Sequence, residues 1–340
     1  MNPALVFCFL FFTLLTPACS PQRPGVVTPS DATLPTERSG YVAGEGGVRL
    51  FYQVDGEGPD TIVVLHGGPG LNLEGLRPDL RPLGRRHTLL YFDQRGSGRS
   101  ERPDQLRLTG AAMVEDIEAI RRAFRLERLT LFGHSWGGAL AVLYGSSHPD
   151  RVERLVLVGP VPPRPHPYFD QYDAEQAARH DSVTNARLQR LGRIQELTRD
   201  PVRICRERFG LVKVGLTATL DLARKVRGDL CAGTLANVRG MDLLLRQVWS
   251  SLTVDGDPEG RYDFRPLAER IPVPGLVVHG AEDPMPLPGS EEWVRALPRG
   301  RLLVVPGAGH YPYAEQPELF FPAVEAFLAG AAQEQRVEPR

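Results

Sequence analysis

A chain of 340 residues is long enough for one large α/β domain with an insertion, or for two domains. Apolar residues make up 42% of the chain, which is enough to build a globular core. The formal net charge of −1 gives no electrostatic reason to expect nucleic acid as a partner.

The first residues have the pattern of an export signal. The stretch from Ala4 to Leu15 is almost continuously apolar, too short to span a bilayer but suited to the apolar core of a signal peptide. It leads into Thr-Pro-Ala-Cys19, which resembles a bacterial lipobox with Cys19 as the lipidated residue. Ordinary cleavage after Ala18 is the alternative. We therefore expect residues 1–19 to be a signal peptide of lipoprotein type. The mature protein would be anchored to the cell envelope, or otherwise secreted or periplasmic.

The composition also predicts segments outside a folded core. Residues 20–39 are rich in Pro, Ser and Thr and lack apolar runs, which predicts a flexible tether. Residues 331–340 are predicted to be a polar tail. An even pair of cysteines, Cys205 and Cys231, remains in the exported part and predicts a disulfide. Two buried thiols are the alternative.

Strand and helix patterns alternate in two parts of the chain, residues 40–160 and 271–330. The predicted strands are residues 48–54, 61–65, 87–92, 128–132, 155–158, 275–279 and 301–305. The predicted helices are residues 111–124, with Thr109 as N-cap, 139–144 and 315–328. Between these parts, residues 161–270 begin with many prolines and continue as charged helices without strands. The fold class is therefore α/β, a mostly parallel central sheet flanked by helices, with an inserted helical cap.

The segment at 131–138, Leu-Phe-Gly-His-Ser-Trp-Gly-Gly, contains the pattern G-x-S-x-G between a predicted strand and a predicted helix. This is the context of a nucleophile elbow, a turn so tight that only glycine fits beside the serine, at Gly133 and Gly137. The turn raises the Ser135 hydroxyl above the sheet edge, at a helix N-terminus. A glycine-rich helix start with an incidental serine is the alternative.

The loop at 66–70, His-Gly-Gly-Pro-Gly, follows a buried strand and has the composition of an oxyanion hole. Its glycines leave backbone N–H groups without side-chain cover. We expect the N–H groups of Gly68 and Trp136 to be the donors, and the Gly68–Pro69 peptide bond to be cis. The residues expected to support this loop are His66, Gly67 and Pro69.

Two further loops, each just past a predicted strand, supply an acid and a base. The order Ser135, Asp283, His310 is that of an α/β-hydrolase, and parallel strands bring their carboxyl ends to one edge. His310 would take the proton of Ser135, and Asp283 would orient and stabilise the imidazolium. Asp283 is favoured over Glu282 because Pro284 follows it and can hold the loop rigid.

Other polar motifs have simpler explanations. The loop at 93–100 lacks the G-K-[ST] of a phosphate-binding loop, and we expect its charged residues to pair with each other. His134 would be turned away from the acid by the elbow, and His279 would be a satisfied core residue. No group of His, Cys and Asp has the spacing of a zinc site, so we expect no metal and no other cofactor.

Together these loops resemble the proline iminopeptidase family of α/β-hydrolases. The motifs that carry the resemblance lie at residues 66–70, 93–100, 133–138, 280–284 and 307–310. The resemblance covers both α/β parts and implies release of an N-terminal residue, often proline, from peptides. In this family carboxylates of the cap receive the free amino terminus of the substrate. The tryptophan-rich cap segment with a glutamate that is typical of the family has no counterpart here. The cap glutamates that could take this role, each more simply a solvated helix residue, are Glu175, Glu196 and Glu207.

Three functions follow from these residues. The first is a serine aminopeptidase that forms an acyl-enzyme and needs no cofactor. The second is an exported esterase or lactonase with the same Ser-His-Asp residues and a different cap pocket. The third is a binding protein that keeps the fold without catalysis, which the presence of all three catalytic residue types argues against. In each case the partner is a small molecule or a peptide.

Overall fold

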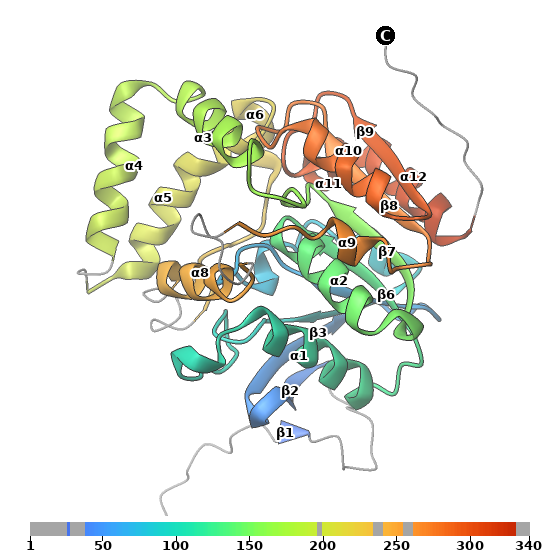
Figure 1. Ribbon diagram of the computed structural model, residues 1–340. Helices are drawn as coiled ribbons and strands as arrows, with labels where there is room; N and C mark the ends of the chain where they lie inside the picture. Colours follow the sequence, from blue (N-terminus) through green and yellow to red (C-terminus); the bar gives the residue numbers. More distant parts are fainter. Residues whose placement is uncertain (1–25, 28–37, 196–198, 234–240, 254–260, 331–340) are drawn as a thin grey trace, which may run out of the picture.

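A single sheet forms the centre of the computed structural model, which describes residues 26–27, 38–195, 199–233, 241–253 and 261–330. In these residues the sheet has nine strands in the order β1-β2-β3-β5-β4-β6-β7-β8-β9 (Figure 1). The strands are β1 (Val26–Val27), β2 (Ser39–Ala43), β3 (Arg49–Asp55), β4 (Thr61–Leu65), β5 (Thr88–Phe92), β6 (Leu129–His134), β7 (Val152–Val158), β8 (Gly275–Gly280) and β9 (Gly300–Val305). From β5 to β9 all neighbours are parallel, whereas β3 is antiparallel to both β2 and β5. The mostly parallel sheet is as predicted.

The predicted strands are all present, with ends that move by at most three residues. β1 and β2 were not predicted. β1 lies inside the segment expected to be a tether, and it pairs with β2, which begins at the last residue of that segment. Residues 26–27 and 39 of that segment therefore belong to the sheet, where a Val-Val pair suits an edge strand. The predicted signal peptide with Cys19 and the predicted tail at 331–340 lie outside the described residues.

The core has two halves, one on each face of the sheet, because successive side chains of a strand point to opposite faces. In β6, Leu131 packs with the residues of one half and Phe132 with those of the other. The helices over the first face are α1 (Gly110–Ala123), α2 (Trp136–Ser147) and α10 (Leu287–Ala296). The second face is covered by α12 (Pro317–Leu328) and the turns at 73–75 and 83–85. Burial on both faces explains why the central strands are continuously apolar.

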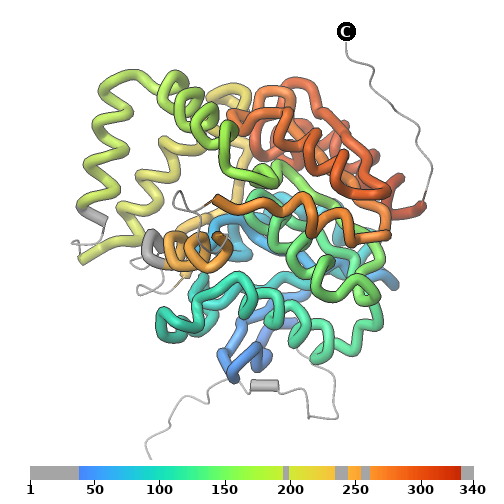
Figure 2. The backbone as a smooth tube through the Cα atoms, viewed as in Figure 1, coloured from blue at the N-terminus to red at the C-terminus, as the bar shows by residue number. Residues whose placement is uncertain are grey.

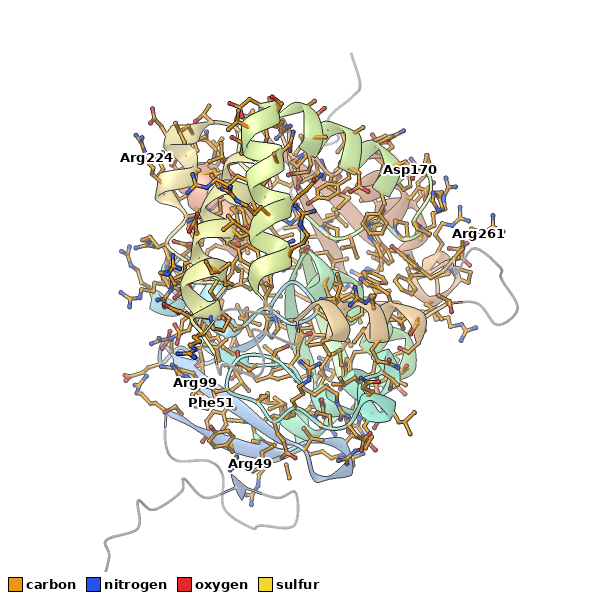
Figure 3. All side chains as sticks on the ribbon, turned by 90° about the vertical axis from the view of Figure 1, so that its left-hand side faces the viewer. Arg49, Phe51, Arg99, Asp170, Arg224 and Arg261 are labelled. Carbon is orange, nitrogen blue, oxygen red and sulfur yellow. A yellow bond between two sulfur atoms is a disulfide. The ribbon has the colours of Figure 1, made fainter. Side chains whose placement is uncertain are left out.

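In its described residues the predicted cap consists of helices joined by loops and contains no strand. After β7 the chain leaves the sheet, and it returns through α9 (Arg265–Ala268) to β8 (Figure 2). The cap helices are α3 (Tyr168–Ala178), α4 (Ser182–Gln195), α5 (Pro201–Leu216), α6 (Leu220–Lys225) and α8 (Met241–Ser250). Seen from the cap side, α4 and α5 stand in front of the molecule (Figure 3).

A disulfide joins Cys205 in α5 to Cys231 after α6, as the sequence predicts. It closes a loop within the cap, across a sequence separation of 26 residues. Among all the described residues, no helix is both long enough and apolar enough to cross a bilayer.

Candidate active site

Ser135 lies in a tight turn between β6 and α2. Its φ of 55° and ψ of −119° form a conformation that is unfavourable for a residue with a side chain. A Cβ at Gly133 would lie 2.2 Å from the carbonyl oxygen of Gly137. A Cβ at Gly137 would lie 2.2 Å from that of Leu65. The prediction that only glycine fits at both positions is confirmed.

The carboxyl ends of β8 and β9 bring Asp283 and His310 together. Nδ1 of His310 lies 2.8 Å from Oδ2 of Asp283, and both side chains are buried. The other carboxylate oxygen of Asp283 accepts the N–H of Met285 at 2.9 Å. The neighbouring Glu282 is exposed instead. The structure thus pairs His310 with the carboxylate that the sequence favours.

This pairing decides which buried histidine can carry a proton. Burial opposes the charge of His310, but the Asp283 carboxylate outweighs it and raises the pKa of His310 above its ordinary value. Burial likewise opposes the charge of Asp283, yet His310 holds the pKa of that carboxyl low. By contrast, burial and the nearby charge of His310 lower the pKa of His134 to about 3. Nε2 of His134 donates to the carbonyl oxygen of His310 at 2.9 Å, so His134 is a neutral support.

Gly159 makes room for the Asp283–His310 pair because it has no side chain. It follows β7 directly and has a φ of 47°. A Cβ at this position would lie 3.1 Å from Nδ1 of His310 and 3.2 Å from Oδ2 of Asp283. The sequence reasoning did not single out this residue, although a glycine straight after a strand of this sheet is a usable signal.

Glu315 is a second residue that the sequence reasoning missed. It ends the short helix α11 (Pro312–Glu315) and is completely buried. Its carboxylate accepts the N–H groups of Gly309 at 2.9 Å, Tyr311 at 3.0 Å and Ala218 at 2.8 Å. Two of these flank His310 and the third follows cap helix α5. Glu315 therefore holds the His310 loop and ties it to the cap.

A side-chain network supports the loop at 66–70. His66 donates from Nδ1 to the Gly67 carbonyl at 2.8 Å and accepts the N–H of Gln94 at its Nε2, at 3.0 Å. The Gln94 amide donates to the His66 carbonyl at 2.8 Å and accepts from Nε1 of Trp136 at 2.9 Å. Burial lowers the pKa of His66 to about 4, so this histidine stays neutral. His66 thus makes hydrogen bonds within this loop and to Gln94, a partner that the sequence reasoning missed.

The two residues expected to supply the oxyanion donors are found at the cavity and at the start of α2. Gly68 lines the same cavity as Ser135, and its bond to Pro69 is cis as predicted. Trp136 is the first residue of α2, a position whose backbone N–H has no partner within the helix.

The prediction that the charged residues of the loop at 93–100 pair with each other is confirmed only in part. The Asp93 carboxylate accepts the backbone N–H of Arg99 at 2.7 Å inside the loop, whereas the side-chain ion pairs of the two arginines go to other elements. The buried guanidinium of Arg95 binds Asp116 at 2.7 Å and also reaches Glu45. Arg99 lies over the ring of Phe51, 4.6 Å from its centre (Figure 3). A buried guanidinium has five N–H groups to satisfy, more than this short loop can accept. The side chains of Arg95 and Arg99 therefore anchor the loop to the surrounding elements.

Two remaining expectations concern His279 and metal ions. Nδ1 of His279 lies 2.9 Å from Oγ of Ser290 in the core, so this histidine is satisfied as predicted. Within the described residues, no group of three or more His, Cys, Asp or Glu side chains is placed to hold a metal ion.

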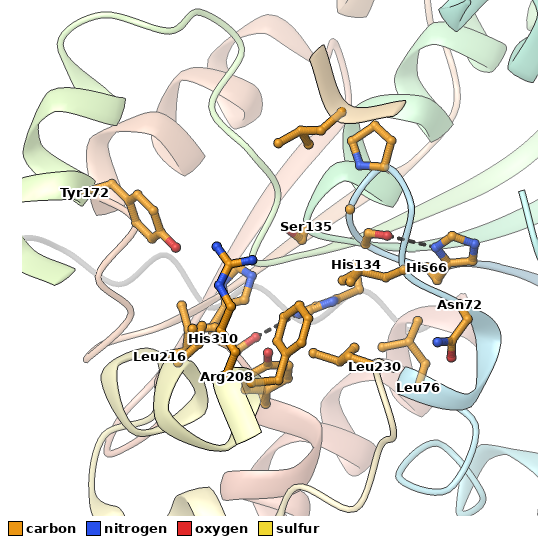
Figure 4. Close-up of a pocket in the computed structure, with 18 residues that line it drawn as sticks. His66, Asn72, Leu76, His134, Ser135, Tyr172, Arg208, Leu216, Leu230 and His310 are labelled. Carbon is orange, nitrogen blue, oxygen red and sulfur yellow. Dashed lines mark hydrogen bonds between the residues drawn. The ribbon is translucent and has the colours of Figure 1, made fainter. Parts of the chain in front are cut away.

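A cavity of about 340 Å³ lies between the sheet edge and the cap (Figure 4). Ser135 and His310 both line it, together with Arg208 and Tyr172 of the cap. Its apolar wall includes Leu76, Phe209, Val212, Leu216, Leu230 and Leu245. No Asp or Glu is among the described residues that line this cavity.

Two of the three cap glutamates considered as amine receptors do not line this cavity. Glu175 pairs with Arg179 at 2.9 Å, and Glu207 pairs with Arg187 at 2.7 Å. Glu196 lies outside the described residues.

Comparison with known proteins assigns the chain to a family. The sequence profile of the alpha/beta hydrolase fold matches residues 60–317. A proline iminopeptidase of Xylella fastidiosa (strain 9a5c) is 30% identical over 292 residues, which are 79% of this chain and 89% of the relative. The crystal structure of proline iminopeptidase from Mycobacterium smegmatis superposes with a TM-score of 0.61 at 22% identity, covering 86% of this chain and 98% of the other. The esterase RhEst1 from Rhodococcus sp. ECU1013 gives 0.64 at 21% identity, covering 86% and 99%. The chain belongs to the α/β-hydrolase family, as a serine-type hydrolase with proline iminopeptidases among its relatives.

Proposed function

We propose that this protein hydrolyses acyl compounds through a covalent acyl-enzyme on Ser135. The observation that carries the proposal is the Asp283–His310 pair, whose histidine lines the same cavity as Ser135. Because Nδ1 of His310 is engaged by Asp283, Nε2 is the nitrogen left to take a proton from the serine hydroxyl. Asp283 fixes that tautomer and stabilises the imidazolium.

The reaction then follows from these roles. Oγ of Ser135 attacks the substrate carbonyl carbon while His310 takes its proton, and the N–H groups of Gly68 and Trp136 stabilise the oxyanion. His310 gives the proton to the leaving alcohol or amine as the carbonyl re-forms. A water molecule, deprotonated by His310, attacks the acyl-enzyme and releases the carboxylic acid and the free serine.

Two substrate classes have separate support. The proline iminopeptidases among the relatives support an aminopeptidase that releases N-terminal residues such as proline. The described cavity wall supports an esterase instead, because it offers an arginine and no carboxylate to a substrate ammonium group. We favour the esterase on this geometry.

The decisive assay compares prolyl-2-naphthylamide with 4-nitrophenyl butyrate on the purified protein. Ester hydrolysis without amide cleavage is the expected result. Release of naphthylamine at a rate comparable to the ester would instead establish the aminopeptidase. No turnover of either by a folded protein that also resists serine-directed reagents would leave only the binding-protein function.

We also propose that the protein is exported and anchored through a lipid on Cys19. The apolar stretch before Cys19 supports this, and so does the Cys205–Cys231 disulfide, a bond typical of oxidising compartments. Metabolic labelling with a palmitate analogue should mark the native chain and not Cys19→Ser. Equal labelling of both would refute the anchor.

A further inference from the structure

Two polar side chains of the cap point into the cavity over Ser135 without any partner among the described residues. They are Arg208 of α5 and Tyr172 of α3, and both line the cavity with His310 (Figure 4). Neither makes a hydrogen bond or an ion pair with the described part of the chain. The other arginines of the same helix behave differently, since Arg203 pairs with Asp200 and Arg206 with Asp229 at the surface.

The surroundings of Arg208 favour an anion. The nearby wall is apolar, including Val212, Leu216 and Leu230, and the guanidinium stays charged at any physiological pH. A positive charge that is partly removed from water and lacks a counter-charge attracts an anion more strongly than one at the surface. Arg208 is itself only half-buried, so it can remain in the cavity without a protein partner.

Tyr172 supplies a neutral donor to the same cavity. Burial, with the negative charges of Asp283 and Asp173, raises the pKa of the Tyr172 hydroxyl. The hydroxyl therefore keeps its proton and can donate it in a hydrogen bond. The carboxylate of Asp283 cannot serve as the missing partner of Arg208, because it is already bound to His310 and Met285.

We propose that Arg208 and Tyr172 form a binding subsite for a carboxylate of the substrate. The fork of the guanidinium matches the two oxygens of a carboxylate, and the tyrosine hydroxyl adds a third donor. The proposal rests on the proposed function, and it names the substrate class as acyl compounds that carry a carboxylate on an apolar body. A substrate with an ammonium group at this place would be repelled.

The test measures binding without turnover. Ser135→Ala is titrated by calorimetry with hexanoate and with hexanamide, which differ only in the charged group. We expect hexanoate to bind about 10-fold or more tightly than hexanamide, as a charge-assisted hydrogen bond predicts. In the Ser135→Ala, Arg208→Gln double variant the preference for hexanoate should fall to the small part that Tyr172 supplies. Tyr172→Phe should reduce the preference by a smaller factor.

The matched control is Arg203→Gln in the same background, which removes an equal charge from the same helix outside the cavity. It should keep the preference for hexanoate. Arg208→Lys retains the charge without the fork and should keep part of the preference, which guards against a misfolded Arg208→Gln. Equal binding of the two compounds to Ser135→Ala would overturn the subsite, and so would an unchanged preference in folded Arg208→Gln. Since no reaction is measured, this result is independent of whether Ser135 is the nucleophile.

Discussion

Nδ1 of His310 lies 2.8 Å from a carboxylate oxygen of Asp283, although 27 residues separate the two along the chain. The contact forms because β8 and β9 are adjacent parallel strands that end at the same edge of the sheet. The adjacent Glu282 points to solvent, so one position along the loop decides which carboxylate meets the imidazole.

Asp283→Asn should change both the rate and the pH profile of hydrolysis. The Asp283 charge raises the pKa of His310, and only neutral His310 can accept a proton, so wild-type kcat/KM should fall as pH decreases through that pKa. Without the charge, burial dominates and the pKa falls, so the acid limb should move to lower pH. The asparagine also favours the wrong tautomer, and kcat should drop by about 10⁴-fold. An acid limb that stays in place would show that another group controls the profile.

Glu315→Gln should impair catalysis, although Glu315 itself does not line the substrate cavity. The variant replaces a carboxylate that accepts three backbone N–H groups around His310 and the end of α5. A misplaced base lowers kcat, and we expect a loss of about 10- to 100-fold with KM little changed. Glu318→Gln, at an exposed position of α12, is the control and should behave as wild type. A rise in KM alone would assign Glu315 to substrate binding instead.

Gln94→Leu should weaken the oxyanion loop. The side-chain amide links the His66 carbonyl to the indole of Trp136, so its loss leaves a buried carbonyl oxygen and a buried ring N–H without these partners. We expect kcat to fall by about 10²-fold, within the range for disturbed oxyanion donors, and thermal stability to fall as well. Gln94→Glu restores an acceptor for Trp136 and should recover part of the activity if the network acts as described. Full activity in Gln94→Leu would show that Gln94 does not support the oxyanion loop.

Removal of the cap disulfide should destabilise the protein. For a sequence separation of 26 residues, the chain-entropy account gives a loss of about 3 to 4 kcal/mol in the free energy of unfolding of the bridged region. The double variant Cys205→Ser, Cys231→Ser should therefore unfold at a lower denaturant concentration than the oxidised wild type. Reduced wild type is the matched control and should resemble the double variant. Equal midpoints for all three would mean that the bridge adds no stability.

The sequence predicted the sheet from short-range patterns, and it predicted the Asp283–His310 pair from the order of the motifs and the common edge at which parallel strands end. Apolar runs mark strands buried on two faces, and the glycines around Ser135 mark a turn that no other residue can make. The residues that were missed act across long distances in the chain. Gln94 reaches Trp136, and Glu315 reaches Ala218, through contacts that no local pattern records.

The cap was predictable as helical but not as a binding surface. Arg208 and Arg203 sit five residues apart on one helix, and their types are identical. Only the placement of α5 in the folded cap makes Arg208 line the cavity and Arg203 face solvent. The pairing inside the loop at 93–100 was predicted only in part for the same reason, since the partners of the Arg95 side chain come from other elements.

The nucleophilic role of Ser135 is tested most directly by labelling with a fluorophosphonate and mapping the adduct by mass spectrometry. We expect one adduct per chain, on Ser135, absent in Ser135→Ala and much slower in Asp283→Asn, with all three proteins equally folded by circular dichroism. An unlabelled Ser135 in folded wild type, or an adduct on another residue that persists in Ser135→Ala, would contradict the acyl-enzyme mechanism.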